Sequence, residues 1–398
     1  MVVSSIHQRP GRLHRLEWGG GKIDADVAVV GAGPAGAALA IMLGRAGLKT
    51  VLLDRSRFPR DKACGEGLMP AGVSILEELG VALDSFPSLG GVSYRVPLAG
   101  SAKGDFMNGK AGRGVRRLVF DQVLAERARA TTNVDARYGC EASGVELRGR
   151  LAVVTTAGGE IACRYVIGAD GIHSRVARWM GWVRPPRSRR FALVSHVAAP
   201  RHGVDRVIVT LAAGCEVYSA PTSPDELLVA VLGSKSGLRA NDEPARDAYA
   251  RHVGAVHPNL RVPADVAIHG AGPFWVRPST VADGRVFLVG DAAGFLDPLT
   301  GDGMSDALVA ARRLSNLLAS ELPDPAAEYR RWERGQWRRR MFVNRLALTL
   351  TGSSGLARRA LRGMQRSPST LNRLLEINDG SRGLSSLSLR DWSAMVGV

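Results

Sequence analysis

A glycine-rich turn between a predicted strand and a predicted helix is the feature that most constrains the fold of this chain. It follows the β-branched run 26–30 and consists of Gly31, Ala32, Gly33, Pro34, Ala35 and Gly36. Glycines keep such a turn open to a pyrophosphate, and the free N–H groups of the following helix point at the phosphates. Asp54 ends the next predicted strand, where a carboxylate can accept a hydrogen bond from a ribose 2′-hydroxyl. The unit predicts a parallel sheet that binds a dinucleotide, and the acid disfavours tightly held NADP.

Two further motifs place an acidic residue directly after a predicted strand. One spans residues 168–175 and the other spans 289–303. Their residues with predicted roles are Asp170, Arg175, Asp291, Gly301 and Gly303. Ligands of open α/β sheets bind at the carboxyl edge of the strands, so all three motifs are predicted to gather there. The helix predicted after the third motif adds free amide groups for a second polar part of the ligand.

These three motifs, in this order and spacing, resemble the group A flavoprotein monooxygenases and the related geranylgeranyl reductases, which share the FAD fold of glutathione reductase. The resemblance covers about residues 25–325 and implies a non-covalently bound FAD. It places the ADP part of FAD at Gly31, Gly33, Pro34, Ala35, Gly36, Asp54 and Arg55. It also implies that Asp170, with Arg175, supports FAD and the pyridine nucleotide, that Asp291 holds the ribitol, and that Gly301 and Gly303 face the flavin pyrimidine.

A fourth segment sharpens the resemblance. Residues 58–70 are similar to the F-P-R-x-K-x-C-G-x-G-L-x-P segment of the reductases and related hydroxylases, which passes the flavin ring. This implies that Cys64 and Gly65 lie near the ring, while a buried cysteine that acts as a small apolar group stays an equal alternative for Cys64. Arg117, placed before a helix expected to start at Asp121, matches the family's arginine and is implied to contact the flavin. Arg60 and Lys62 are expected to be ordinary surface cations.

The order of predicted elements indicates an α/β protein with a discontinuous architecture. Strand and helix patterns of the parallel type alternate with Pro- and Gly-separated runs that suit an antiparallel sheet. We expect a Rossmann-like FAD-binding domain with an inserted antiparallel-sheet substrate domain and a helical C-terminal region. The expected parts are a flexible arm (1–22), the FAD-binding domain (23–87, 118–187 and 281–322), the substrate domain (88–117 and 188–280) and the basic helical C-terminal region (323–398).

Two flavin chemistries remain open from the sequence. In the favoured one, NAD(P)H is a transient reductant and O₂ is used to hydroxylate a hydrophobic, aromatic or polyketide-like substrate. In the other, reduced FAD saturates isoprenoid double bonds. The reductases often carry Y-x-W-x-F-P, whereas residues 216–221 here keep Tyr218 and Pro221 but lack the Trp and Phe. Because FAD would carry the reaction, no catalytic acid or base is named, and His173 and His196 are expected to be structural.

The C-terminal region carries most of the excess positive charge. The net charge is +16, and residues 330–391 contain fourteen arginines against four acidic residues. Such a segment suits a peripheral contact with an anionic membrane surface, which the basic helix at 329–342 would make. No nucleic-acid-binding motif accompanies this segment, so a nucleic acid is not the expected partner. Because arginines and aromatics are mixed around that helix, its tryptophans are expected to cover the substrate domain instead.

The remaining composition indicates a reduced, intracellular chain. The four cysteines are far apart, which gives neither a disulfide framework nor a metal-ligand spacing. No apolar run reaches the roughly 18 residues of a membrane span, and the first 22 residues lack the apolar core of a signal peptide. A cytoplasmic location, with membrane association through the basic helix as an addition, is therefore the expectation.

Overall fold

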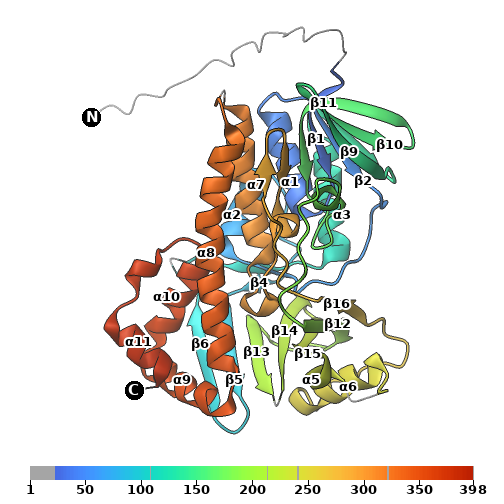
Figure 1. Cartoon of the computed structure of the whole chain (residues 1–398). Coiled ribbons are helices and arrows are strands. Elements are labelled where there is room, and N and C mark those ends of the chain that lie inside the picture. The colour runs from blue at the N-terminus through green and yellow to red at the C-terminus, as the bar shows by residue number, and fades with distance from the viewer. Residues whose placement is uncertain (1–22, 108, 213, 240–241, 321, 398) are drawn as a thin grey trace.

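The fold consists of two large sheets joined by a small one, with helices around the first sheet and a helical C-terminal region (Figure 1). The structure is a computed structural model that describes residues 23–107, 109–212, 214–239, 242–320 and 322–397. The arm predicted for residues 1–22 lies outside the described residues.

The first sheet is Rossmann-like, as predicted. Its parallel strands lie in the order β18, β11, β1, β2 and β8, and β17 pairs antiparallel with β18 at one edge. The strands are β1 (Ala25–Val30), β2 (Thr50–Asp54), β8 (Val134–Tyr138), β11 (Gly159–Gly168), β17 (Ala282–Asp283) and β18 (Val286–Leu288). An antiparallel ribbon, β9 (Ala142–Arg148) and β10 (Leu151–Thr156), extends from β11. The nearly continuous burial of β1 and β2 explains why most of their residues are apolar.

Helix α1 (Pro34–Arg45) packs between α3 (Arg117–Arg129) and α7 (Gly303–Ala319), and α2 (Pro70–Glu78) packs on α7. Proline favours the start of α1, because a backbone N–H in the first turn of a helix has no acceptor within the helix and proline loses nothing by lacking one. The sequence predicted a helix that starts at Asp121, but α3 starts four residues earlier, at Arg117. The two residues are therefore one helical turn apart, where an ion pair stabilises the start of the helix.

The second sheet is antiparallel apart from one pair, β5 with β13, which is parallel. In spatial order its strands are β16 (His269–Ala271), β12 (Arg190–Ala198), β15 (Glu226–Ser234), β14 (Cys215–Ser223), β13 (Val207–Ala212), β5 (Gly91–Val96) and β6 (Gly100–Asp105). Helices α5 (Lys235–Leu238) and α6 (Ala245–Val256) pack on the outer side of this sheet. The other side, called the inner face here, carries a separate apolar cluster that includes Tyr218 and Leu299.

A small three-stranded sheet joins the two large ones. It pairs β7 (Gly112–Gly114) with both β3 (Gly67–Leu68) and β4 (Ser88–Leu89). Residues 88–117 therefore do not all belong to the second sheet, since β4 and β7 are in the small sheet, where β7 bonds to β3 of the segment predicted for the first domain. The domain division of the chain stays a prediction.

The C-terminal region is helical, as predicted, and consists of α8 (Pro325–Thr351), α9 (Ser354–Arg366), α10 (Pro368–Asn378) and α11 (Leu389–Val396). Figure 1 shows α8 running the length of the molecule. Trp332 stacks on Tyr329 against the core of the first sheet, and Trp337 lies between the guanidinium groups of Arg277 and Arg340. Trp332 therefore does not cover the segment predicted for the substrate domain, whereas Trp337 contacts Arg277 of that segment. None of the helices in the described ranges is long and apolar enough to cross a bilayer.

Candidate functional site

The three glycine motifs follow neighbouring parallel strands and emerge at one edge of the first sheet. Val30 of β1 pairs with Gly168 of β11, and Gly168 pairs with Leu288 of β18. On the other side of β1, Val30 pairs with Leu53, so Asp54 follows at the same level. The carboxyl ends of these strands thus place the three predicted motifs and Asp54 side by side, which is where open α/β sheets bind ligands.

The glycines of the first motif serve two different purposes. Gly31 has φ +105°, and a Cβ there would lie 2.4 Å from the carbonyl oxygen of Ala169. A Cβ on Gly36 would lie 1.8 Å from the carbonyl oxygen of Gly31, so both positions must be glycine for the fold itself. At Gly33 the nearest atoms are the guanidinium nitrogens of two arginines, Arg60 at 3.6 Å and Arg117 at 4.0 Å. The protein leaves this approach open and flanks it with positive charge, which fits a phosphate.

Asp54 is buried and is held against the first motif. Its Oδ2 accepts a hydrogen bond from the Ala32 amide at 2.8 Å, and its Oδ1 accepts one from Ser56 at 2.8 Å. The neighbouring Arg55 is exposed. Arg60 was expected to be a surface cation, but only 18% of its side chain is exposed, and it lies 3.8 Å from Asp54 and 3.4 Å from Asp121. The two buried carboxylates therefore hold the Arg60 side chain beside the first motif.

The acids of the second and third motifs both have carboxylate oxygens left for a ligand. Asp170 Oδ2 accepts hydrogen bonds from the amides of Arg175 (2.6 Å) and Val176 (3.2 Å), whereas its Oδ1 is buried and has no partner among the described residues. Such an oxygen costs free energy unless a bound group donates to it. Asp291 is half-buried in a short 3₁₀ turn, Gly290–Ala293. Arg175 instead pairs with Glu141, so the structure does not bring its guanidinium to this site.

Arg117 forms a buried ion pair at the start of α3. Its Nε and Nη2 donate to Asp121 Oδ1 and Oδ2 at 2.6 and 2.7 Å, and its amide donates to Glu66 Oε1 at 2.7 Å. Cys64 lies beside this pair and accepts a weak hydrogen bond from the Glu66 amide. Burial raises the pKa of the Cys64 thiol above its usual value. A neutral thiol is a poor nucleophile, so Cys64 fits a small packing group better than a reactive one.

A Glu–His pair at the same end of the site was missed by the sequence analysis. Glu66 is 1% exposed, and its Oε2 lies 2.8 Å from Nε2 of His196 on β12. Burial alone would lower the pKa of His196, but the hydrogen bond and the charge of Glu66 outweigh it and raise this pKa. The alternating pattern around His196 indicated a strand, but nothing in the sequence indicated a partner 130 residues away.

We expect the Glu66–His196 pair to make stability depend on pH. A pKa raised on folding stabilises the folded state below the ordinary histidine pKa of about 6.5, and this contribution is lost as the pH rises through the raised value. At pH 6, His196→Gln should unfold a few degrees below the wild type, for a loss of about 1–2 kcal/mol, and the difference should narrow by pH 9. Thermal unfolding at both pH values measures this. His202→Gln, which removes a hydrogen bond to a backbone carbonyl, is the control, and a difference independent of pH would contradict the expectation.

Tyr218 lies where the inner face of the second sheet meets the loops of the first. Its ring is 3.6 Å from a Cβ built on Gly65 and 3.9 Å from one on Gly301, and its hydroxyl is 2.6 Å from one on Gly67. Burial raises the pKa of Tyr218 well above its usual range, so the phenol is neutral. Three short side chains share the inner-face cluster with it: Ala192, Ala220 and Ala230.

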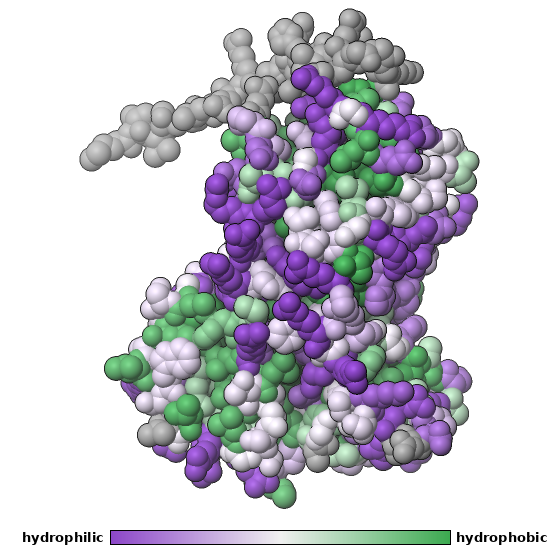
Figure 2. All heavy atoms as spheres, viewed as in Figure 1, coloured by the Kyte–Doolittle hydropathy of each residue, from purple (hydrophilic) through white to green (hydrophobic). Residues whose placement is uncertain are grey.

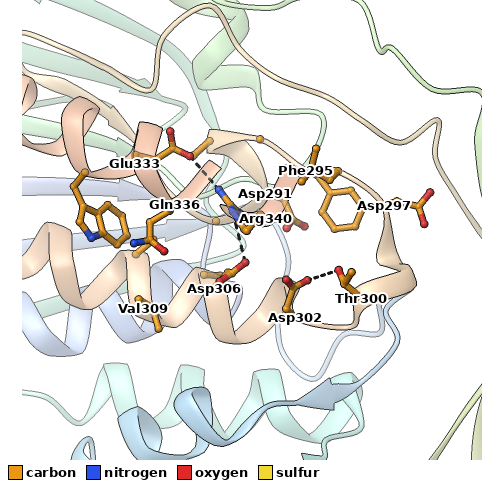
Figure 3. A pocket seen from close by; sticks show the side chains of 18 of the residues that line it. Asp291, Phe295, Asp297, Thr300, Asp302, Asp306, Val309, Glu333, Gln336 and Arg340 are labelled. Atoms are coloured by element: carbon orange, nitrogen blue, oxygen red, sulfur yellow. Dashed lines mark hydrogen bonds and ion pairs between the residues drawn. The ribbon is translucent and has the colours of Figure 1, made fainter. Parts of the chain in front are cut away.

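A small cavity lies between the loop of the third motif and helices α7 and α8 (Figure 3). Its volume is about 40 Å³, which holds water but not a ring-shaped substrate. Arg340 and Glu333, both on α8, pair at 3.0 Å in its wall, and Arg339 donates to Asp306 of α7 at 3.1 Å. Burial, with Asp302 nearby, raises the pKa of Asp306 to about 7. The Arg339–Asp306 contact joins α8 to α7, the helix that follows Gly301 and begins at Gly303.

The fold and the site together define an FAD-dependent oxidoreductase. The family model described as "FAD binding domain" matches residues 24–345, and the chain belongs to this family. The residues present fit the cofactor, because the approach at Gly33 is open and Asp170 keeps a buried oxygen to which none of the described residues donates. These two features of the site therefore support the binding of FAD that the sequence motifs imply.

Named relatives carry out more than one flavin reaction. A menaquinone reductase of Mycolicibacterium smegmatis is 29% identical over 336 residues, which are 74% of this chain and 76% of that protein. A squalene epoxidase of Aspergillus fumigatus is 28% identical and covers 75% of this chain and 67% of that one. A flavoprotein/dehydrogenase of Cytophaga hutchinsonii has the same fold, with a TM-score of 0.76 at 21% identity over 89% of this chain and 92% of its own. The comparisons leave the reaction type open.

Proposed function

We propose that the enzyme is an NAD(P)H-dependent monooxygenase that hydroxylates a hydrophobic aromatic or polyketide-like substrate. The position of Tyr218 carries this proposal, because it brings the apolar inner face of the second sheet against both loops predicted to meet the flavin ring. Ala192, Ala220 and Ala230 keep the side chains of this buried cluster short, which would suit a flat ring. Ala220 stands in the stretch where the reductases have aromatic side chains, which would occupy that space.

The FAD contacts predicted from the sequence form part of the same proposal. The first motif, with Asp54, would hold the ADP part; Asp170 and Asp291 would accept hydrogen bonds from hydroxyl groups; the amides near Gly301 and Gly303 would face the pyrimidine. Arg55 is exposed and would meet only the adenosine end. FAD, when bound, supplies electron transfer from NAD(P)H to O₂. The proposal places the enzyme in the cytoplasm, where NAD(P)H is available.

The chain's own side chains would orient the substrate and handle protons. Inner-face residues such as Val194 and Leu228 are almost fully buried and would exclude water from the reacting atoms. His196, whose pKa the hydrogen bond to Glu66 and its charge raise, would hold a proton at the ring end of the site. The buried phenol of Tyr218 would donate a hydrogen bond to a polar group of the substrate or cofactor.

Reduction of isoprenoid double bonds is the second candidate. The name of the menaquinone reductase relative favours it, and so does the Glu66–His196 pair with its raised histidine pKa, because saturation of a C=C bond consumes a hydride and a proton. Its weakness is the absence of the reductases' aromatic side chains next to Tyr218.

Oxygen dependence separates the two candidates. We expect purified holoenzyme to oxidise NAD(P)H faster when alkylphenols are added, to consume O₂ in step with it, and to give products with one added oxygen atom. Quinones and polyprenyl lipids serve as the comparison substrates, and parallel reactions without O₂ serve as the control. Anaerobic turnover that adds two hydrogen atoms to a polyprenyl lipid would overturn the monooxygenase and establish the reductase.

A further inference from the structure

Helix α11 exposes large apolar side chains to solvent along one of its sides. Leu389 is 87% exposed, Trp392 41% and Val396 49%, and their spacing places them on one side of the helix. The opposite side, with Ala394 and Met395, is buried. Figure 2 shows hydrophobic side chains gathered over the end of the molecule where α9, α10 and α11 lie. A stripe of this kind marks a binding surface.

Helix α9 presents a row of arginines without opposing charge. Arg358, Arg362 and Arg366 are one turn apart and exposed, and Arg359 is exposed beside them. The helix contains no acidic residue. Across the residues that the structure describes, none of these four arginines forms an ion pair, whereas those of α8 at Arg339 and Arg340 do. The positive charge of α9 is thus available to a partner.

The apolar stripe and the arginine row lie on two neighbouring helices that are in backbone contact. A Cβ on Gly363 of α9 would lie 1.9 Å from the carbonyl oxygen of Ala394 in α11. A Cβ on Gly397 would lie 2.5 Å from the carbonyl oxygen of Arg359. We call the stripe and the four arginines together the α9–α11 surface.

We propose that the α9–α11 surface binds the anionic surface of a lipid bilayer. Arginine pairs with phosphate through two parallel hydrogen bonds, and an adjacent apolar helix face with a tryptophan enters the boundary between headgroups and acyl chains. A second copy of the chain would oppose the same four arginines with their own like charge. A nucleic acid would meet the arginines but leave the apolar stripe uncovered.

This inference moves the predicted membrane contact from α8 to the helices after it. Trp332 and Trp337 of α8 already pack against the body of the protein, so they are not free to enter a bilayer. Trp392, by contrast, is braced edge-on by Phe342 while part of it stays exposed. The inference does not depend on whether the enzyme hydroxylates or reduces its substrate.

Co-sedimentation of the full holoenzyme with vesicles tests the proposal. Vesicles of phosphatidylcholine containing phosphatidylglycerol should bind the protein at low salt, and pure phosphatidylcholine vesicles should bind it far more weakly. Brominated acyl chains should quench part of the tryptophan fluorescence, and Trp392→Phe should remove that quenched part. Absence of binding to the anionic vesicles at low salt would overturn the proposal.

Two matched pairs of substitutions distinguish this surface from general attraction to a basic protein. Arg358→Gln with Arg362→Gln should weaken vesicle binding about 30-fold, since each arginine near the surface contributes about fivefold. Arg334→Gln with Arg338→Gln removes the same charge from exposed positions of α8 and should change binding little. Equal losses in both pairs would overturn the proposal. So would a dimer in sedimentation velocity that Leu389→Ser dissociates while vesicle binding is unchanged.

Discussion

Gly33→Ala is expected to yield colourless protein with an intact fold. The backbone of Gly33 (φ −71°, ψ −176°) is accessible to alanine, and its Cβ would meet only the ends of two arginine side chains, at 3.6 Å and beyond. The same methyl group would occupy the space through which a pyrophosphate reaches the turn. We therefore expect FAD affinity to fall on the order of 100-fold, about 3 kcal/mol, with little change in the unfolding of the cofactor-free protein.

Two other glycines provide the controls for this experiment. Gly36→Ala places its Cβ 1.8 Å from the carbonyl oxygen of Gly31, so this change should destabilise the fold itself. Gly335→Ala lies in the interior of α8 with nothing within 4 Å, and should leave FAD binding unchanged while adding up to about 1 kcal/mol of stability. Fluorescence titration with FAD and thermal unfolding measure the three variants. Gly33→Ala protein that retains wild-type FAD affinity would contradict a phosphate at this turn.

The contrast between these glycines shows why the early part of the fold could be predicted. The strand, turn and helix around Gly31 follow from local pattern, because burial on both faces of β1 demands a continuous apolar run and the turn demands glycine. The side-by-side position of the three motifs also follows, since parallel neighbours align their carboxyl ends. Local rules extend to the C-terminal helices, whose existence was predicted correctly.

Contacts between distant segments could not be predicted in the same way. The partner of Glu66 is on a strand of the other sheet, and Arg60 meets Asp121 on a helix that the sequence started one turn too late. Each of these side chains also suits the protein surface, so its residue type carries no signal of burial. Which face of α8 packs inward was likewise hidden, because arginines alternate with tryptophans around the helix. Only the tertiary structure decides that Trp337 is enclosed by two guanidinium groups.

Arg117→Met is expected to destabilise the protein by about 3 kcal/mol. Asp121 is fully buried, and Arg117 donates to both of its carboxylate oxygens. Removal of the arginine leaves a buried charge with only Arg60, at 3.4 Å, for compensation, and losing one member of such a pair typically costs about 3–5 kcal/mol. Urea unfolding of the cofactor-free protein measures the loss, and an unchanged midpoint would show that Asp121 is not held by this pair.

The double variant Arg117→Met with Asp121→Leu separates folding from cofactor binding. Replacing a whole buried ion pair by apolar side chains is often neutral or stabilising, so the double variant should regain most of the stability lost by Arg117→Met. Its FAD affinity should stay low, because the guanidinium group that lies 4.0 Å from a Cβ on Gly33 is still absent. If instead the double variant binds FAD as tightly as the wild type, Arg117 stabilises α3 alone. The positive charge at the phosphate approach is then supplied by Arg60, which Arg60→Gln would reveal in the same titration.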